Sequence, residues 1–129
     1  MSSRILIVDD NPLVQDLTQL ILQQREDFLV DSAWHGAEAV RACAEEQYDV
    51  VLMDCQMPIM DGPEATRCIR KLGTRQPVII GISGHAIKSC KEQCLAAGMD
   101  DFLTKPYTSE QLLAAVANGL EIAARRCAA

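Results

Sequence analysis

The chain has 129 residues, a formal net charge of −6 and a pI of about 4.8. This length suits one compact domain with a single hydrophobic core. An acidic surface repels phosphate backbones, so the charge argues against direct binding of nucleic acid. No apolar run approaches the ~20 residues that cross a bilayer, so we expect no membrane segment in the chain.

Six cysteines are spread along the chain without a C-x-x-C motif. Cys90 and Cys94 lie four residues apart on one predicted helix face, but no nearby second pair completes a zinc site. We therefore expect reduced thiols that act as small hydrophobic side chains, which favours a cytoplasmic location. Cys55 follows an acid at the end of a strand, and the sequence assigns it no role.

The first half of the chain alternates short apolar runs with amphipathic segments. Residues 5–8 form an aliphatic run typical of a buried strand, and residues 28–30 predict a shorter one. Asn11 followed by Pro12 is typical of a helix start, and apolar residues continue at helical spacing at Leu13, Leu17, Leu20 and Ile21. Residues 35–47 predict a second helix with one face formed by Ala37, Val40 and Ala44.

The second half repeats the alternation. Strands are predicted at residues 50–53, 78–82 and 102–103, and helices at residues 62–72 and 88–97. Thr108 with Gln111 matches a capping box that opens a last helix. The core face of that helix is predicted to contain Leu112 or Leu113, Val116 and Leu120.

Five strand–helix units with short connections predict the fold class. Strands that are continuously apolar are buried on both faces, which indicates a parallel sheet with helices on each side. We expect an α/β, doubly wound (βα)5 fold in a single domain over residues 1–129. Its core covers about residues 4–124, and the termini are expected to fray.

Polar side chains stand at the ends of four of these strands. The first strand ends in Asp9 and Asp10, the third in Asp54 and the fourth in Ser83, and Lys105 follows the fifth. The carboxyl ends of parallel strands meet at one edge of the sheet, so these groups are expected to converge there.

The converging acids predict a metal site. Three carboxylates within ~5 Å repel at about 3 kcal/mol per pair, and a hard cation such as Mg²⁺ offsets that repulsion. A carboxylate beside Mg²⁺ can attack phosphorus to form an aspartyl-phosphate. The alternative reading of Asp9 and Asp10 is a pair of acids favoured by the positive end of a helix dipole.

Four segments in this order and spacing resemble the receiver domain of two-component response regulators, most closely those attached to hybrid histidine kinases. The segments are ILIVDDNPLV, VVLMDCQMPIMDGPEATRCIR, VIIGISGHA and GMDDFLTKP. The resemblance runs from about Arg4 to the end of the last helix. It implies a flavodoxin-like sheet with strand order 2-1-3-4-5.

The resemblance also implies a role for each site residue. Asp54 would be the phosphoacceptor, and it would bind Mg²⁺, or Mn²⁺ in its place, together with Asp10, Asp9 and the backbone carbonyl of Gln56. Asp10 would bind the metal directly and Asp9 mainly through water. Lys105 would pair with the phosphoryl group, through a cis peptide bond between Lys105 and Pro106.

Further roles concern switching and the lifetime of the phosphoryl group. Ser83 would move toward the phosphoryl group, and Phe102 occupies the position of the switch aromatic. Gln56 and His85 lie two residues after Asp54 and Ser83, and we expect them to tune how fast the phosphoryl group is lost.

The sequence thus predicts a phosphorelay module rather than an enzyme, with only self-phosphorylation and slow self-dephosphorylation at Asp54. A histidine kinase or histidine phosphotransfer domain would donate the phosphoryl group. The face made by the helix at 88–97, the strand at 102–103 and the last helix would control a partner or linked domain. The alternatives are a Mg²⁺-dependent phosphohydrolase with an aspartyl-phosphate intermediate and a degenerate receiver used only as a binding surface.

Overall fold

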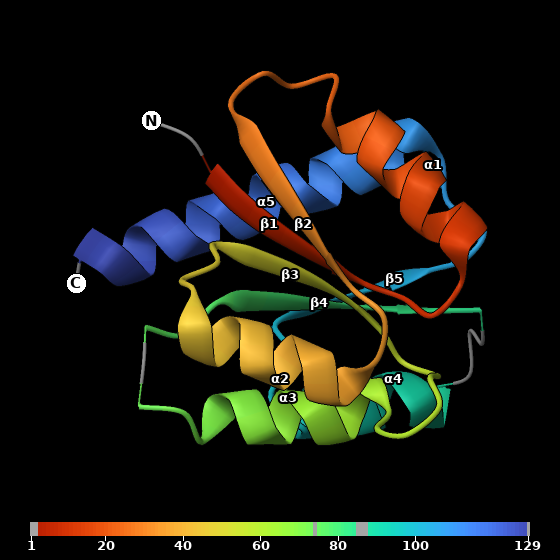
Figure 1. Ribbon diagram of the computed structural model, residues 1–129, viewed down its shortest axis with the longest axis vertical. Helices are drawn as coiled ribbons and strands as arrows, with labels where there is room; N and C mark the ends of the chain where they lie inside the picture. Colours follow the sequence, from red (N-terminus) through yellow and green to blue (C-terminus); the bar gives the residue numbers. More distant parts are fainter. Residues whose placement is uncertain (1–2, 74, 85–87, 129) are drawn as a thin grey trace.

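A five-stranded parallel sheet forms the central layer of the computed structural model, which describes residues 3–73, 75–84 and 88–128 (Figure 1). The strands run side by side in the order β2-β1-β3-β4-β5, which confirms the predicted topology. Their bounds are β1 Ser3–Val8, β2 Phe28–Ala33, β3 Val50–Asp54, β4 Val78–Ser83 and β5 Asp101–Thr104.

Helices cover both faces of the sheet. Figure 1 shows α1 and α5 on one face, with α2, α3 and α4 on the other. Their bounds are α1 Pro12–Leu22, α2 Gly36–Glu45, α3 Gly62–Arg70, α4 Lys88–Ala96 and α5 Ser109–Ala128. Among the described residues, no helix combines the length and the apolar character that crossing a membrane demands.

The sheet divides the core into two clusters, because neighbouring side chains of a strand point to opposite faces. In β1, Leu6 and Val8 pack toward one cluster, and Ile5 and Ile7 pack toward the other. All residues of β3 and β4 are buried, which confirms the expectation of strands covered on both faces. The buried face of α5 includes Leu112 and Val116, as predicted.

Side-chain caps start two of the helices as the sequence indicates. The side-chain oxygen of Asn11 accepts hydrogen bonds from the backbone amides of Leu13 and Val14, and Pro12 is the first residue of α1. Thr108 and Gln111 form a reciprocal capping box at α5, with bonds of 2.8 and 3.0 Å. These local contacts fix where the helices begin.

The predicted helix α1 is confirmed, but of the apolar residues at helical spacing only Ile21 packs against the core, and the leucines point outward. Leu13, Leu17 and Leu20 are 64, 51 and 64% exposed. The residues that α1 buries are instead Gln15, Thr18 and Leu22. Apolar spacing therefore identified the helix but not the side that meets the sheet.

The predicted face of α2 is also displaced. Ala37 and Ala44 are exposed and Val40 is only partly buried. The buried residues of α2 are Gly36, Ala39 and Cys43. Small residues are so frequent in this helix that several faces look equally apolar in the sequence, and packing against β1 and β2 selects one of them.

A partly buried ion pair joins four elements at the edge of the sheet opposite the strand ends that carry the acids. Asp100 accepts hydrogen bonds from the guanidinium of Arg70 at 2.8 Å and from the backbone amide of Ile79 at 2.9 Å. It also pairs with Arg126 near the end of α5. Asp100 thereby connects α3, β4, β5 and α5.

Replacing Asp100 with alanine is expected to lower the free energy of unfolding by about 2–4 kcal/mol, because Arg70 and the Ile79 amide lose their partner at a site that water reaches only in part. Urea unfolding measures this change. The matched control is Asp27→Ala, which breaks an ion pair with Arg25 between two half-exposed side chains and should cost less than about 1 kcal/mol. Equal effects of the two variants would contradict the prediction.

Candidate acid-lined site

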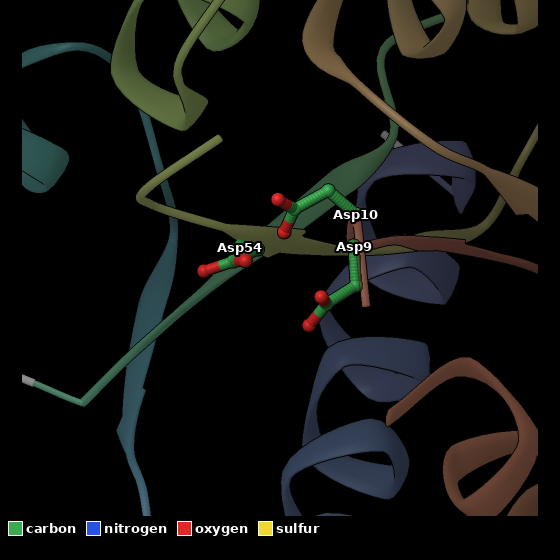
Figure 2. A group of neighbouring side chains, drawn as sticks. All are labelled: Asp9, Asp10 and Asp54. Atoms are coloured by element: carbon green, nitrogen blue, oxygen red, sulfur yellow. The ribbon is translucent and has the colours of Figure 1, made fainter. Parts of the chain in front are cut away.

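Three carboxylates gather at the carboxyl ends of β1 and β3 (Figure 2). Asp9 and Asp10 follow β1, and Asp54 is the last residue of β3. One oxygen from each lies within 4.8 Å of the other two. Asp9 and Asp54 are buried, at 4 and 7% exposure, whereas Asp10 is exposed. The sheet thus brings together the three acids that the sequence predicted.

Asp9 is fixed by polar contacts from two directions. Its Oδ1 accepts a hydrogen bond of 2.9 Å from the backbone amide of Asn11, and its Oδ2 lies 3.4 Å from the Nζ of Lys105. The backbone amide of Asp9 donates to the carbonyl of Ala33 at the end of β2. These contacts hold the first acid against the ends of three strands.

Gln15 supports this position, and the sequence gave no reason to select it. Its side-chain Nε2 lies within 2.8–3.2 Å of the backbone carbonyls of Ile7, Asp9 and Ala33. The residue is 1% exposed. Glutamine is usually found on the surface of a helix, so only the packing of α1 against β1 and β2 reveals this contact.

Asp54 is held in place by backbone contacts of the residue that follows it. The next residue, Cys55, donates its amide to the carbonyl of Ile82 in β4 and accepts a hydrogen bond from the amide of Gly62. A Cβ atom on Gly62 would lie 2.4 Å from the carbonyl oxygen of Asp54, so only glycine permits this approach. The start of α3 therefore packs directly on the end of β3.

The loop from β3 to α3 contains a strained turn at Ile59. This residue has a φ of 72°, and the amide of Met60 donates to the carbonyl of Pro58 at 2.8 Å. That bond, between residues two apart around a positive φ, is typical of the rare γ-turn, which is costly for a β-branched residue. The carbonyl of Met60 accepts the amide of Gly36, which ties the loop to the start of α2.

Ser83 and Lys105 stand on the other side of Asp54. Ser83 ends β4, is 1% exposed and comes directly after Ile82, the register partner of Asp54. The amide of Lys105 donates to the carbonyl of Ser83 at 2.8 Å. The peptide bond between Lys105 and Pro106 is cis.

Phe102 lies opposite a glycine in the sheet. It is the register partner of Gly81, and its ring would lie 3.3 Å from a Cβ atom on that glycine. The ring is partly buried and packs against the cluster beneath α3 and α4. The sulfur of Met99 would lie only 2.5 Å from that Cβ atom, so glycine at position 81 leaves room for Met99, with the ring of Phe102 beside it.

Two residues with predicted roles are less well defined. The amide of Gln56 donates to Oδ1 of Asp54 at 3.3 Å, and its side chain is exposed. The role of its carbonyl as a metal ligand stays a prediction. His85 lies outside the described residues, so its predicted influence on the phosphoryl group stays a prediction too.

The environment of Asp54 disfavours its charged form. Burial raises the pKa of this carboxyl to about 6, and the neighbouring Asp9 acts in the same direction. Lys105 and the amide of Gln56 partly counter the shift. Three acids facing one lysine leave an excess of negative charge that a divalent cation could neutralise, and carboxylates are the ligands that Mg²⁺ prefers.

The arrangement is that of a doubly wound α/β domain with an acid-lined site at the carboxyl edge of a parallel sheet. A profile described as the response regulator receiver domain matches residues 5–117 of the chain. The chain therefore belongs to the response regulator receiver domain family.

Curated relatives come from several kinds of signalling protein. The chain is 44% identical over 112 residues to two-component system protein A of Emericella nidulans, covering 84% of this chain and 16% of that protein. It is 39% identical over 126 residues to the sensor protein GacS of Pseudomonas syringae, covering 95 and 14%. It thus spans only about a sixth or a seventh of these relatives. The rice two-component response regulator ORR41 is 38% identical over 112 residues, covering 84 and 87%.

Solved receiver domains have the same fold. The receiver domain of sensor histidine kinase PA1611 from Pseudomonas aeruginosa, which has a magnesium ion coordinated in its active-site cleft, superposes with a TM-score of 0.86. It is 34% identical, and the match covers 94% of this chain and 99% of that one. A CheY-like receiver domain from Methanospirillum hungatei gives a TM-score of 0.88 at 28% identity, covering 98 and 99%.

Asp54→Asn is expected to raise the free energy of unfolding at neutral pH, without metal, by up to about 3 kcal/mol. The pKa of Asp54 is about 6 in the folded chain and 3.8 ordinarily, so folding disfavours the ionised carboxylate. The neutral amide of asparagine does not have this unfavourable contribution. The gain should be full above pH ~6, shrink as the pH falls and vanish below pH ~4, where Asp54 is protonated in both states.

Urea unfolding of both chains in a chelating buffer, at several pH values, measures the difference. Asp16→Asn on the exposed side of α1 is the matched control, because it removes one negative charge away from the acid cluster. A gain that did not depend on pH, or that the control reproduced, would contradict the assignment of the raised pKa to Asp54.

Proposed function

We propose that the chain is a phosphoacceptor receiver of a phosphorelay, in which Asp54 takes a phosphoryl group from a phosphohistidine. The observation that carries this proposal is the position of Asp54, a buried carboxylate at a strand end, within 4.8 Å of two further acids. Membership of the receiver family and the similarity to receivers of sensor kinases support it. A histidine kinase or a histidine phosphotransfer domain is the proposed donor.

The acid set fits a divalent cation, Mg²⁺ or Mn²⁺ in its place. Asp9, Asp10, Asp54 and the carbonyl of Gln56 would hold it, and three carboxylate oxygens in reach of one another match the hard oxygen ligands that such cations take. Bound there, the cation supplies positive charge that screens the carboxylates from an incoming phosphoryl group.

The chain's own residues perform the transfer. An ionised oxygen of Asp54 forms the new O–P bond as the P–N bond to the donor histidine breaks, and the electron pair returns to the imidazole. With a pKa near 6, Asp54 is largely ionised at neutral pH. Lys105, held beside the acids by its contact with Asp9, can offer an ammonium to the transferred oxygens.

Transfer would shift the equilibrium between two states of the domain. The new charge on Asp54 would draw in Lys105 and the hydroxyl of Ser83, and Phe102 would repack over Gly81. The surface formed by α4, β5 and α5 would then change its preference for a downstream protein or a linked domain. Phe102 is partly buried and packs at the border of the core rather than inside it, and this position supports the role.

The chain is proposed to act in signalling and not as a turnover enzyme. It would phosphorylate itself and lose the phosphoryl group slowly, with Gln56 and His85 setting the rate. Direct binding of nucleic acid is not proposed, in keeping with the net charge of −6.

A chain carrying Asp54→Asn should accept no labelled phosphoryl group from a phosphorylated donor domain, while the unaltered chain accepts about one per molecule. Phosphate label that is retained on the protein after gel separation measures the transfer. Chelating the divalent cation should stop transfer to the unaltered chain. Asp27→Asn, at an exposed acid beside the start of β1 and away from the acid cluster, should leave it intact. Repeated release of phosphate from small esters would instead support a hydrolase.

The exposed leucines of α1 are the surface that we propose meets the phosphodonor. Leu13, Leu17 and Leu20 form an apolar stripe that starts three residues after Asp10, beside the acid cluster. A donor that presents a phosphohistidine to Asp54 has to approach this end of the molecule. Burying such a stripe contributes binding energy without taking part in the chemistry.

Leu17→Ser is therefore expected to slow transfer from a protein donor about tenfold or more, but to leave phosphorylation by a small acyl phosphate unchanged. Leu29→Ser is the matched control. Leu29 is similarly exposed, at 53%, but it pairs with Arg4 at the far end of β2. If Leu17→Ser slowed phosphorylation equally with both donors, Leu17 would be needed for folding or for the transfer reaction itself, which would contradict a docking role.

A further inference from the structure

Two thiols are in contact between the end of β3 and α4. The sulfur atoms of Cys55, which follows Asp54, and Cys94, on α4, lie 3.1 Å apart. Both residues are buried, at 4 and 0% exposure, although 39 positions separate them in the sequence. A disulfide has an S–S distance of about 2.05 Å, so the atoms need to approach by about 1 Å to bond.

Cys55 is the fixed member of this pair. Its amide donates to Ile82 in β4 and its carbonyl accepts from Gly62 at the start of α3. Its sulfur lies above Gly81, 3.5 Å from where a Cβ atom of that residue would stand. With its backbone fixed in this way, Cys55 directs its sulfur toward Cys94 on α4.

A third thiol, Cys90, lies one helical turn before Cys94 and is half-buried. Its sulfur is 3.8 Å from the hydroxyl of Ser83. Cys90 and Cys94 do not suit a mutual disulfide, because Cβ atoms four residues apart on a helix are about 5–6 Å from each other, whereas a disulfide needs about 3.5–4.5 Å. Cys55 is therefore the partner that the geometry offers to Cys94.

We propose that Cys55 and Cys94 are a site of oxidative modification, at which a peroxide converts the two thiols into an intramolecular disulfide. One sulfur attacks the peroxide, the O–O bond breaks, and a sulfenic acid and one water form. The second sulfur attacks the first, the S–O bond breaks, and a second water leaves. The two sulfurs lose two electrons, the peroxide gains them, and both thiol protons end in water.

Burial sets the pace of this reaction. Both thiols lie in the core, at 4 and 0% exposure, so a peroxide in the solvent reaches them only slowly. The more exposed thiols of Cys68 and Cys90 are expected to react with an alkylating reagent first. The pair is therefore expected to oxidise slowly, once peroxide has reached the space beneath α4.

The cross-link would join the residue after Asp54 to α4. This consequence rests on the proposed function, since it concerns the movement of α4 relative to the strand ends. With α4 tied to β3, the shift that accompanies phosphorylation is restrained. The oxidised chain should bind the phosphoryl mimic BeF₃⁻ with Mg²⁺ several-fold more weakly than the reduced chain.

Peptide mapping of the full chain tests the site itself. The folded protein is treated with hydrogen peroxide over time, alkylated, and cut with trypsin and a glutamate-specific protease without reduction. Cleavage after Lys91 separates Cys90 from Cys94, and cleavage after Glu45 or Glu46 separates Cys43 from Cys55. Mass spectrometry should find Cys55 linked to Cys94, with two thiols lost.

The variants Cys55→Ala and Cys94→Ser should each lose the cross-link. Cys43→Ala, a buried thiol of the same core cluster, should keep it. A different pairing in the folded chain, or full oxidation of Cys68 and Cys90 with no link between Cys55 and Cys94, would overturn the proposal. So would a link that forms only in denaturant.

The mapping does not depend on phosphoryl transfer, so Asp54→Asn should form the same disulfide. The consequence for switching is measured separately, by titrating BeF₃⁻ and Mg²⁺ calorimetrically into the oxidised and reduced chains. If the disulfide is mapped but the oxidised and reduced chains bind BeF₃⁻ equally well, the proposed restraint on α4 is overturned and the disulfide is not. Absence of binding in both forms would count against the proposed function and leave the mapped disulfide standing.

Discussion

Three carboxylates whose oxygens lie within 4.8 Å of one another repel at about 3 kcal/mol per pair at an effective dielectric of 20. Asp9 and Asp54 sustain this repulsion while nearly excluded from water, so the rest of the fold has to hold them in place. The clearest sign of that cost is the pKa of Asp54, raised to about 6 by burial and by Asp9. Because the three carboxylates repel one another, binding of a cation that neutralises their charge is favoured.

The fold holds the acids in place against this repulsion mainly through hydrogen bonds of the backbone. Asp9 is held by the amide of Asn11 and, through Ala33, by the end of β2. Asp54 is followed by a residue bonded to both β4 and the start of α3, and Gly62 has no side chain to prevent that approach. The side chain of Asp54 itself accepts only a long hydrogen bond of 3.3 Å from the amide of Gln56, so most of its capacity to accept hydrogen bonds and metal ions is kept for chemistry.

Some of this could be predicted because the signals are local. Asn11 with Pro12 and Thr108 with Gln111 fix helix starts within a few residues, and they do so in the structure. Other features depend on contacts between distant segments. The leucines of α1 have the spacing of a core face, yet α1 buries Gln15 and Thr18. Gln15 donates hydrogen bonds to carbonyls at the ends of β1 and β2, which a leucine cannot do.

By itself the sequence determined the alternation of strands and helices, the parallel sheet, and the strand ends that carry the acids and Lys105, because hydrophobic runs and helix caps act over short distances. Only the tertiary structure decided which face of α1 and α2 is buried, the contact of Gln15 with three carbonyls, the strained turn at Ile59, and the meeting of Cys55 with Cys94. Each of these depends on how segments far apart in the chain pack, and residue spacing contains no information about that.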